Sequence, residues 1–525
     1  MSADVTIPFT PPVARADEQA LPPNEIDRID FEVSSDNGVT WTSVGHTAGT
    51  ATSITVAGLA AGHYLARDTV TDTSTPPLVS EYSPSFSFEV AADTLAPPKP
   101  AIIGGEPEPG DAVDHYPRLG AYAIGSPHDY YSEAYQKLLA KIHVSVLNTY
   151  PGWGGGQHTN PEQVFQQIKA RNPKTRLFNY VIGESLQVPA NEIWAEEEDK
   201  VNSVPWWLYV KGSSGSKVLS DFGHETYIIN ISTQARKDSN GTLFPEWYAD
   251  YAYRTTGQPN PTLDGLYMDN VFWQPRRDGD WNLDGTTDKP SDANVGGWYR
   301  AGNRLYGDTI KSRMPGKLQM ANLADWGHPG AVITEYIDVW NGGVIEHIIG
   351  KSNSLETYEG WDSMMRQYRT TMAALAAPKL GIFQQGGNIT DYRSMRYGLA
   401  SCLMDDGYYS FNDEAHLNYG VPWFDEFDVK LGAATSTPQT AAWQSGVYRR
   451  DFENGIALVN PKGNGTKTVT LEEGFEKIRG TQDPHVNNGA VVHTVTLQDR
   501  DGLLLLREGQ GASLARAERA RSGRS

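Results

Sequence analysis

The chain has 525 residues, of which 39% are hydrophobic and 21% are charged, and its formal net charge is −20 at pH 7. This length predicts several domains with a large core, and the composition excludes wholesale disorder and a collagen-like fibre. The acidic balance argues against nucleic acid and against an anionic membrane surface as partners, because neutralising phosphates requires clustered Lys and Arg.

The N-terminal segment MSADVTIPFTPP has neither the basic region nor the apolar region of a secretion signal, and the chain contains no run of about 18 apolar residues. We therefore expect no membrane span. The expected location is extracellular or virion-associated, with a secretion signal already removed or with another route out of the cell. Cys402 is the single cysteine, which excludes an intrachain disulfide and a Cys-based metal cluster.

Residues 1–93 are predicted to form a β-sandwich. Apolar residues alternate with polar ones and share one face of an early strand, as in Ile29, Phe31 and Val33. Further strand patterns follow at a spacing of roughly ten residues, which is typical of sandwiches. In this pattern, and in the position of Trp41, residues 20–92 resemble a fibronectin type III or related immunoglobulin-like module. A Pro-rich linker is predicted at 94–115.

Residues 116–435 are predicted to form a (β/α)8 barrel, because short apolar strands alternate with amphipathic helical patterns. The predicted strands are residues 118–125, 143–150, 176–183, 263–271, 317–324, 336–341, 380–387 and 407–413. An insertion is expected at 184–262. A doubly wound open sheet is the alternative, but no Gly-rich phosphate loop follows the first strand.

The end of the chain returns to β patterns. Residues 436–507 contain four strand-like segments separated by turns, such as ENG and GNG, which predicts a small antiparallel β domain. The Arg- and Ser-rich residues 508–525 are predicted to be a flexible tail without a function of their own.

The carboxyl ends of the barrel strands are where an active site is expected. Carboxylates, amides and tyrosines follow the predicted strands there: Tyr180, Glu184, Asp269, Asn270, Asn322, Asp325, Asn341, Glu346, Gln384, Gln385, Asn412, Asp413 and Glu414. The sequence shows no nucleophile elbow, no HExxH and no P-loop. This set of residues favours glycosidic bond cleavage, which needs one protonated carboxyl group and one ionised carboxylate.

The sharpest motif is LDGLYMDNVFW at 263–273, in which Asp269 ends a strand that otherwise reads as buried. An ionised group there is costly unless it is paired or used in chemistry. We interpret Asp269 as a catalytic carboxylate. The alternative is a structural role, as a helix cap or as one half of an ion pair.

The barrel and its β tail, residues 116–507, resemble the hypothetical glycoside hydrolase families of bacteria and phages and, more distantly, the endo-α-1,4-polygalactosaminidases. The residues that carry the resemblance are DGLYMDN, which is similar to a family DGxxxDN strand, VWNGGVIEHI, and the tail patterns YRRDFENGIALVNP and DPHVNNGAVVHTVTLQDRDGLLLLR. The resemblance implies a polysaccharide-cleaving barrel with acidic catalysts. It implies a catalytic role for only two residues of this chain, Asp269 and Glu346.

The pair hypothesis makes Asp269 the nucleophile or base and Glu346 the general acid. Glu346 is expected on the sixth βα loop, where an ordinary helix-start glutamate is the alternative interpretation. Asp325 and Glu184 are reserve candidates for the second carboxyl group. Substrate contacts are predicted for polar and aromatic residues near the same rim, with the tryptophans as stacking surfaces for sugar rings: Tyr180, Asn270, Asn322, Gln384, Trp153, Trp273, Trp326 and Trp340.

A second motif, DGDWNLDGTTDKPSD at 278–292, has the spacing of a calcium loop. Oxygen-bearing side chains recur at alternate positions around Gly285, and we predict Asp280, Asn282, Asp284, Asp288 and Asp292 as calcium ligands. Position twelve is Ser291 rather than glutamate, which departs from the motif. An acidic surface turn is the alternative. A bound ion would order the rim of the cleft, and no organic cofactor is predicted.

Together these observations predict a glycoside hydrolase that acts on a polysaccharide or oligosaccharide. The alternative from another class is a non-catalytic carbohydrate-binding protein or a structural component of a phage virion, in which the barrel has lost catalysis. A transglycosylase is a further alternative that differs only in its acceptor. Release of reducing ends would distinguish the hydrolase from the binding protein, whereas sugar binding would not.

Overall fold

A computed structural model describes residues 2–9, 21–36, 38–60, 62–83, 85–90, 115–124, 130–149, 160–191, 193–212, 215–350, 354–416 and 421–509. The chain divides into two compact units, unit 1 (residues 1–98) and unit 2 (residues 99–525). The predicted linker lies outside the described residues except for its last residue, as do 510–525 of the predicted tail.

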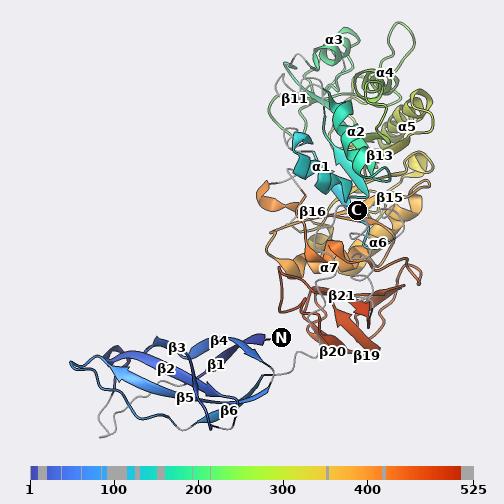
Figure 1. Ribbon diagram of the computed structural model, residues 1–525. Coiled ribbons are helices and arrows are strands. Elements are labelled where there is room, and N and C mark those ends of the chain that lie inside the picture. Colours follow the sequence, from blue (N-terminus) through green and yellow to red (C-terminus); the bar gives the residue numbers. More distant parts are fainter. Residues whose placement is uncertain are drawn as a thin grey trace. The chain divides into compact units, whose positions relative to one another are not determined.

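Unit 1 is a β-sandwich (Figure 1). The strands β1 (Ser2–Pro8) and β4 (Ser53–Ala60) form one antiparallel sheet, and the other has the order β3-β2-β5-β6, with β2 (Ile26–Ser34), β3 (Thr42–Ala48), β5 (Gly62–Asp72) and β6 (Phe86–Val90). A short 3-10 helix, η1 (Pro23–Glu25), precedes β2. Side chains from both sheets meet in one core, which contains the predicted face of Ile29, Phe31 and Val33. The alternation of apolar and polar residues therefore placed this strand correctly.

Unit 2 contains the predicted barrel. Its eight parallel strands are β7 (Gly120–Ala123), β8 (Val144–Leu147), β9 (Arg176–Val181), β12 (Gly265–Met268), β13 (Leu318–Asn322), β14 (Gly342–Ile349), β15 (Leu380–Gly387) and β16 (Tyr408–Asp413). They hydrogen-bond in sequence order, and a parallel bridge between Leu119 and Tyr409 joins the last strand to the first. The sheet is therefore closed, and the carboxyl ends of all eight strands meet at one mouth.

Helices connect most of the strands around the barrel. These are α1 (Glu133–Ala140), α2 (Pro161–Arg171), α5 (Val295–Arg313), α6 (Leu355–Ala374) and α7 (Tyr392–Cys402). Several begin at a polar N-cap whose side chain accepts a backbone hydrogen bond, namely Ser132, Asn160, Ser354 and Asp391. Within the described residues, the β13–β14 connection has only the 3-10 helix η4 (Thr334–Tyr336), and two more, η5 (Glu414–His416) and η6 (Asp425–Asp428), follow β16.

The sixth strand lies later in the chain than predicted. Tyr336 ends the 3-10 helix η4 and a turn follows at 337–339, whereas the strand is β14, which begins at Gly342 and contains Glu346. The prediction that Glu346 lies on a loop is therefore wrong. The cause is a pair of glycines, Gly342 and Gly343, because glycine is more common in loops than in strands. In β14, a Cβ on either residue would collide with a neighbouring strand.

The predicted insertion after the third strand has its own secondary structure. It contains a small antiparallel pair, β10 (Ser185–Gln187) and β11 (Thr226–Ile228), the helices α3 (Ala195–Ser203) and α4 (Phe244–Ala252), and a π-helical turn, η3 (Tyr253–Gly257). Buried tryptophans and tyrosines, such as Trp206, Trp207 and Tyr248, join it to the main core of unit 2. The insertion thus starts at the barrel mouth, because it follows the carboxyl end of β9.

The C-terminal part of unit 2 is a five-stranded antiparallel sheet of the order β17-β18-β21-β19-β20. Its strands are β17 (Tyr448–Phe452), β18 (Gly455–Asn460), β19 (Lys467–Lys477), β20 (Val491–Leu497) and β21 (Asp501–Arg507), as the turn signals predicted. It packs against the barrel through α7 and β21, which lie side by side (Figure 1). Arg396 on α7 pairs with Asp483 at 2.8 Å across this contact.

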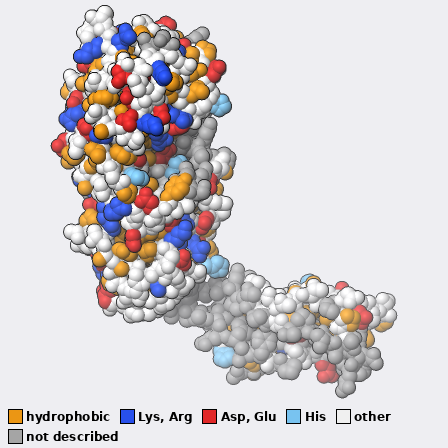
Figure 2. All heavy atoms as spheres, turned by 180° about the vertical axis from the view of Figure 1, so that it is seen from behind, with side chains coloured by type: hydrophobic (Ala, Val, Ile, Leu, Met, Phe, Trp, Pro, Cys, Tyr) orange, Lys and Arg blue, Asp and Glu red, His pale blue; other side chains and the backbone are white. Residues whose placement is uncertain are grey.

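The described surface carries side chains of mixed character. On the face shown in Figure 2, described acidic, basic and apolar side chains are interspersed, without a continuous basic surface. None of the helices in the described part of the chain combines the length and the apolar character that a membrane crossing requires.

Candidate active site

The candidate site sits on top of an apolar layer inside the barrel. Inward-facing residues of five strands are fully buried in this layer: Phe178, Tyr267, Met320, Val344 and Ile382. Because side chains alternate along a strand, the residue two positions further on each strand points into the same interior, one level closer to the mouth. Those residues are polar in every case: Tyr180, Asp269, Asn322, Glu346 and Gln384. All five were predicted as site residues.

Asp269 is held by three hydrogen-bond donors. The Tyr180 hydroxyl donates to Oδ2 at 2.6 Å, while the Asn322 side-chain amide and the backbone N–H of Asn270 each donate to Oδ1 at 2.9 Å. The side chain is buried. These three donors hold the oxygens of Asp269 in defined positions. Asp269 is thus suited to act as a nucleophile or base. The Tyr180 hydroxyl donates its hydrogen to Asp269.

Asn322 connects Asp269 to Glu346. It lies on β13, between the strands that carry the two carboxyl groups, and its Nδ2 also donates to Glu346 Oε2 at 3.1 Å. One nitrogen therefore bridges both side chains, and the sum of its two distances limits the Asp269 Oδ1 to Glu346 Oε2 separation to about 6 Å. In the structure the amide group of Asn322 orients the carboxyl pair, and its predicted contact with a sugar stays a prediction.

The two carboxyl groups differ in their surroundings. Burial raises the pKa of Glu346 to about 7, and the nearby charge of Asp269 adds to the increase. Glu346 accepts one hydrogen bond from Asn322, whereas Asp269 accepts three. Near neutral pH, Glu346 therefore still holds a proton in a large fraction of molecules, which is the state that a general acid requires.

The backbone is strained directly after each member of this pair. Asn270 has a φ of 57° and His347 a φ of 53°, in a region that residues other than glycine seldom adopt. The strand pairing of β14 with β15 is irregular between Ile345 and Ile349. Gln384 supports this bend, because its side-chain oxygen accepts the backbone N–H of His347 at 2.7 Å. Gln384 was predicted to contact substrate, but its oxygen instead positions the segment that carries Glu346.

Two further carboxyl groups lie at the same mouth. Burial raises the pKa of Glu184 and that of Asp325 to about 7 each. The Tyr299 hydroxyl lies 3.2 Å from Glu184 Oε1 and donates to the Asn270 carbonyl at 2.7 Å. Asp325 accepts the backbone N–H of Trp273 at 3.3 Å. The structure thus brings all four predicted carboxyl groups to one region, with Asp269 and Glu346 directly bridged.

Two residues near this mouth were missed by sequence reasoning. Arg276, in the segment after Asp269, carries a positive charge that lowers the pKa of Glu184, Asp325 and Glu346. Its place seven positions after Asp269 could have identified it. Tyr299 lies on α5 in an ordinary amphipathic helix, where no sequence signal separates it from a core tyrosine.

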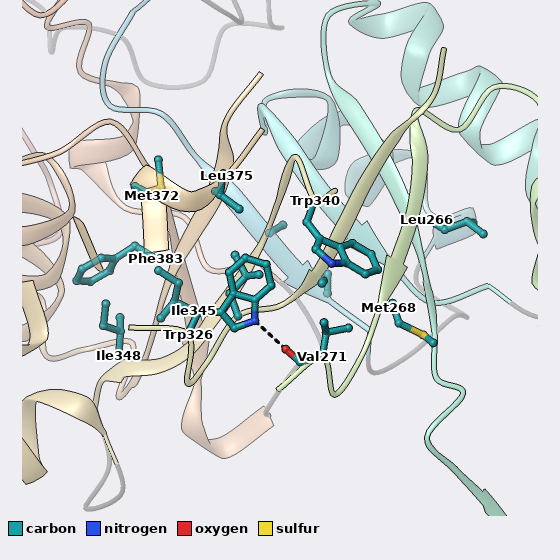
Figure 3. Close-up of a cluster of buried hydrophobic side chains, with 14 of the residues drawn as sticks. Leu266, Met268, Val271, Trp326, Trp340, Ile345, Ile348, Met372, Leu375 and Phe383 are labelled. Atoms are coloured by element: carbon teal, nitrogen blue, oxygen red, sulfur yellow. Dashed lines mark hydrogen bonds between the residues drawn. The ribbon is translucent and has the colours of Figure 1, made fainter. Parts of the chain in front are cut away.

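The tryptophans predicted to stack on sugar rings differ in their exposure. Trp273 is half-buried and lies beside Asp325, with its ring parallel to that of His328 at a centroid distance of 6.5 Å. Trp326 and Trp340 are fully buried, so the prediction that they stack on sugar rings is wrong. Figure 3 shows both in the apolar cluster, with the Trp326 indole N–H donating to the Val271 carbonyl at 2.7 Å. Trp153 lies outside the described residues.

In the loop predicted to bind calcium, the acidic side chains accept hydrogen bonds from backbone N–H groups. Asp280 is fully buried and accepts the N–H groups of Gly212, Asp284 and Gly285, and Asp288 accepts that of Trp281 at 2.8 Å. Asn282 and Asp284 cap the following turns, and Asp292 accepts the N–H of Lys289. Across the described residues, no group of three acidic, His or Cys side chains is gathered for a metal ion. Calcium binding at this loop stays a prediction.

Comparison with known proteins supplies a family for this fold and site. A family model described as hypothetical glycosyl hydrolase family 15 matches residues 169–456, which include all four carboxyl groups. Comparison with curated proteins found no significant match.

Three solved structures of glycoside-degrading proteins are similar to the chain at low sequence identity. A family 39 glycoside hydrolase from Bacteroides cellulosilyticus is 11% identical, with 92% of this chain and 95% of that chain covered and a TM-score of 0.39. A cycloalternan-degrading enzyme from Trueperella pyogenes is 10% identical, with 97% and 96% covered and a TM-score of 0.40. The glycoside hydrolase domain of PelA from Pseudomonas aeruginosa is 12% identical, with 58% and 97% covered and a TM-score of 0.35.

Proposed function

The chain belongs to hypothetical glycosyl hydrolase family 15, and from this premise we propose that it cleaves O-glycosidic bonds of a polysaccharide or cell-surface glycan with Asp269 and Glu346 as the catalytic pair. The observation that carries the proposal is the single amide of Asn322 that donates to both carboxyl groups. This contact holds Asp269 beside Glu346, whose pKa burial raises to about 7, inside the barrel mouth.

In the proposed reaction, Glu346 donates its proton to the glycosidic oxygen as the bond to the leaving sugar breaks. Asp269 attacks the anomeric carbon and forms a glycosyl ester. The Glu346 carboxylate then takes a proton from water, whose oxygen attacks the anomeric carbon and releases Asp269. Overall, one water is consumed for each bond cleaved, and the reaction requires no organic cofactor.

We propose retention of the anomeric configuration. Retaining glycosidases have carboxyl groups about 5–5.5 Å apart, whereas inverting enzymes leave about 6.5–9.5 Å for a water molecule. The shared Asn322 amide places Asp269 Oδ1 and Glu346 Oε2 at most about 6 Å apart, which is compatible with the shorter class. Proton NMR of the first product formed tests this step. Inversion would contradict the nucleophile role of Asp269 while keeping the hydrolase proposal.

Release of reducing ends from bacterial, algal and amino-sugar polysaccharides tests the function itself. We expect activity on at least one glycan, and Asp269→Asn and Glu346→Gln should each reduce it by about 10²-fold or more. Asp308→Asn is the matched control, because it removes an exposed carboxylate on α5 and should leave turnover unchanged. Near wild-type turnover in either site variant would refute the assignment. Product elongation at high substrate concentration would instead indicate a transglycosylase.

Binding of glycans without any release of reducing ends would favour the alternative, a non-catalytic carbohydrate-binding or virion structural protein. The backbone strain at Asn270 and His347 argues for catalysis, since strain of this kind is retained where a side chain must be aimed. The fibronectin type III assignment of unit 1 and an extracellular or virion-associated location stay predictions.

A further inference from the structure

Arg276 differs from the other arginines around the barrel mouth in having no partner. Its neighbour Arg277 pairs with Asp221, and Arg300 pairs with Glu335 at 2.7 Å. Arg276 has neither a hydrogen bond nor an ion pair with any residue that the structure describes, and its side chain is exposed. Its five N–H groups are therefore available to a ligand.

The position of Arg276 is nevertheless defined. Its guanidinium lies over the ring of Phe272, 3.7 Å from the ring centroid, and Phe272 is fully buried three residues after Asp269. A cation on an aromatic face is held there without using its N–H donors. The influence of this charge on the pKa of Glu184, Asp325 and Glu346 places the guanidinium at the same mouth.

Neutralising the site carboxylates does not explain this arrangement. An arginine that served this purpose would be expected to contact at least one of them, as Arg300 contacts Glu335. Burial raises the pKa of Glu184, Asp325 and Glu346 to about 7 each, and the structure shows no hydrogen bond from the guanidinium to any of the three. The acidic balance of the whole chain acts weakly at this point, because salt screens charges beyond about 8 Å.

We propose that Arg276 forms a subsite for an anionic substituent of the glycan, a carboxylate or a sulfate or phosphate ester, on a sugar next to the bond that is cleaved. The planar fork of a guanidinium matches two oxygens of such a group, which is geometry that a neutral sugar does not offer. The inference deepens the proposed function and rests on it, because it assigns the substrate class of the same site.

The test compares binding of matched charged and neutral oligosaccharides by calorimetry. The probes are a galacturonate oligosaccharide and its carboxyl-reduced form, a sulfated chondroitin oligosaccharide and its desulfated form, and a phosphorylated mannose oligosaccharide and its dephosphorylated form. In at least one pair, the charged member should bind about ten- to hundredfold more tightly, which is the effect of a charge-assisted hydrogen-bonded contact.

Variants assign the effect to Arg276. The preference should disappear in Arg276→Gln and persist in part in Arg276→Lys, which keeps the charge without the fork. Arg277→Gln is the matched control, because it removes the same charge one residue away and should keep the preference. Circular dichroism and the melting temperature establish that each variant is folded.

Two results would overturn the subsite: no charged probe binds better than its neutral partner, or the preference survives in Arg276→Gln. Because binding is measured without turnover, this outcome is separate from the fate of the hydrolase proposal. An Arg276-dependent preference without hydrolysis of any glycan would keep the subsite and refute the hydrolase. Hydrolysis of neutral glycans without any charge preference would refute the subsite alone.

Discussion

Replacing Asn322 by alanine tests the central feature of the site, because one amide supports both catalytic carboxyl groups. The variant removes one of the three donors to Asp269 and the Asn322 donor to Glu346. A hydrogen bond to a charged group contributes about 1.5–3 kcal/mol, and 1.36 kcal/mol corresponds to one pKa unit. Since Asn322 favours the ionised form of Glu346, its loss should raise the pKa of Glu346 from about 7 by about one unit or more.

The sign of the pH effect follows from the role of Glu346. A general acid must be protonated, so activity of the wild type should fall as the pH rises through about 7. In Asn322→Ala the alkaline limb of the kcat/KM profile should move upward by about one pH unit, while the maximum falls by about 10²-fold because Asp269 is less well stabilised.

The assay is initial-rate reducing-end release between pH 4 and 10, with Asn172→Ala as a control. Asn172 is also a buried asparagine of unit 2, but its side-chain amide donates to the Ala140 carbonyl at the end of α1. An Asn322→Ala profile that keeps both the height and the alkaline limb of the wild type would refute the reasoning. A fall in height with an unmoved limb would show that Asn322 serves Asp269 alone.

Three other predictions concern stability. Burial raises the pKa of Glu197 on α3 well above its ordinary 4.5, so the stability that Glu197 contributes is fully present below about pH 4.5, where it is protonated, and is lost as the pH rises. Glu197→Gln should therefore match the wild-type melting temperature at pH 4 and exceed it at pH 8. The same difference in melting temperature at both pH values would contradict this. Trp326→Ala should lower the free energy of unfolding in urea by about 3–5 kcal/mol without a loss of glycan affinity, because the indole fills the core. Calcium at about 1 mM should raise the melting temperature of the wild type and not that of Asp284→Ala if the loop binds the ion as its spacing predicts, whereas no shift in either would leave the backbone contacts as its only support.

Much of the fold was predictable because it rests on periodicity. Alternation identified β2 and the C-terminal strands, and short apolar runs identified seven of the eight barrel strands. The failure at the sixth strand has a physical cause. Gly342 and Gly343 interrupt the apolar pattern, yet β14 requires them because neighbouring backbone approaches too closely for a side chain. Sequence alone does not distinguish a glycine that ends a strand from one that permits close packing.

The site was predictable at the level of residue type and less so at the level of role. The strand end selected Asp269, and the family resemblance with the position after the predicted sixth strand selected Glu346; the structure brings the two together through Asn322. The aromatic residues were harder, because a tryptophan after a strand can face the mouth or the helices. Trp273 remains at the mouth, whereas Trp326 lies in the core with its N–H satisfied by Val271. That choice depends on where the chain turns after the strand, which no local pattern encodes.

The position of the backbone strain links the fold to the chemistry. In an undisturbed strand, the residue after Asp269 or Glu346 would continue the extended path outward, and the carboxyl group would be one of a regular row. A left-handed residue directly after each carboxyl-bearing position ends that path. The side chain then remains at the mouth while the next segment turns away, and Gln384 and Tyr299 hold the two turns in place. Such backbone conformations cost about 1–3 kcal/mol each, so a chain without them would have a more stable fold. Their occurrence after both bridged carboxyl groups is therefore best explained by a need to keep Asp269 and Glu346 facing one another.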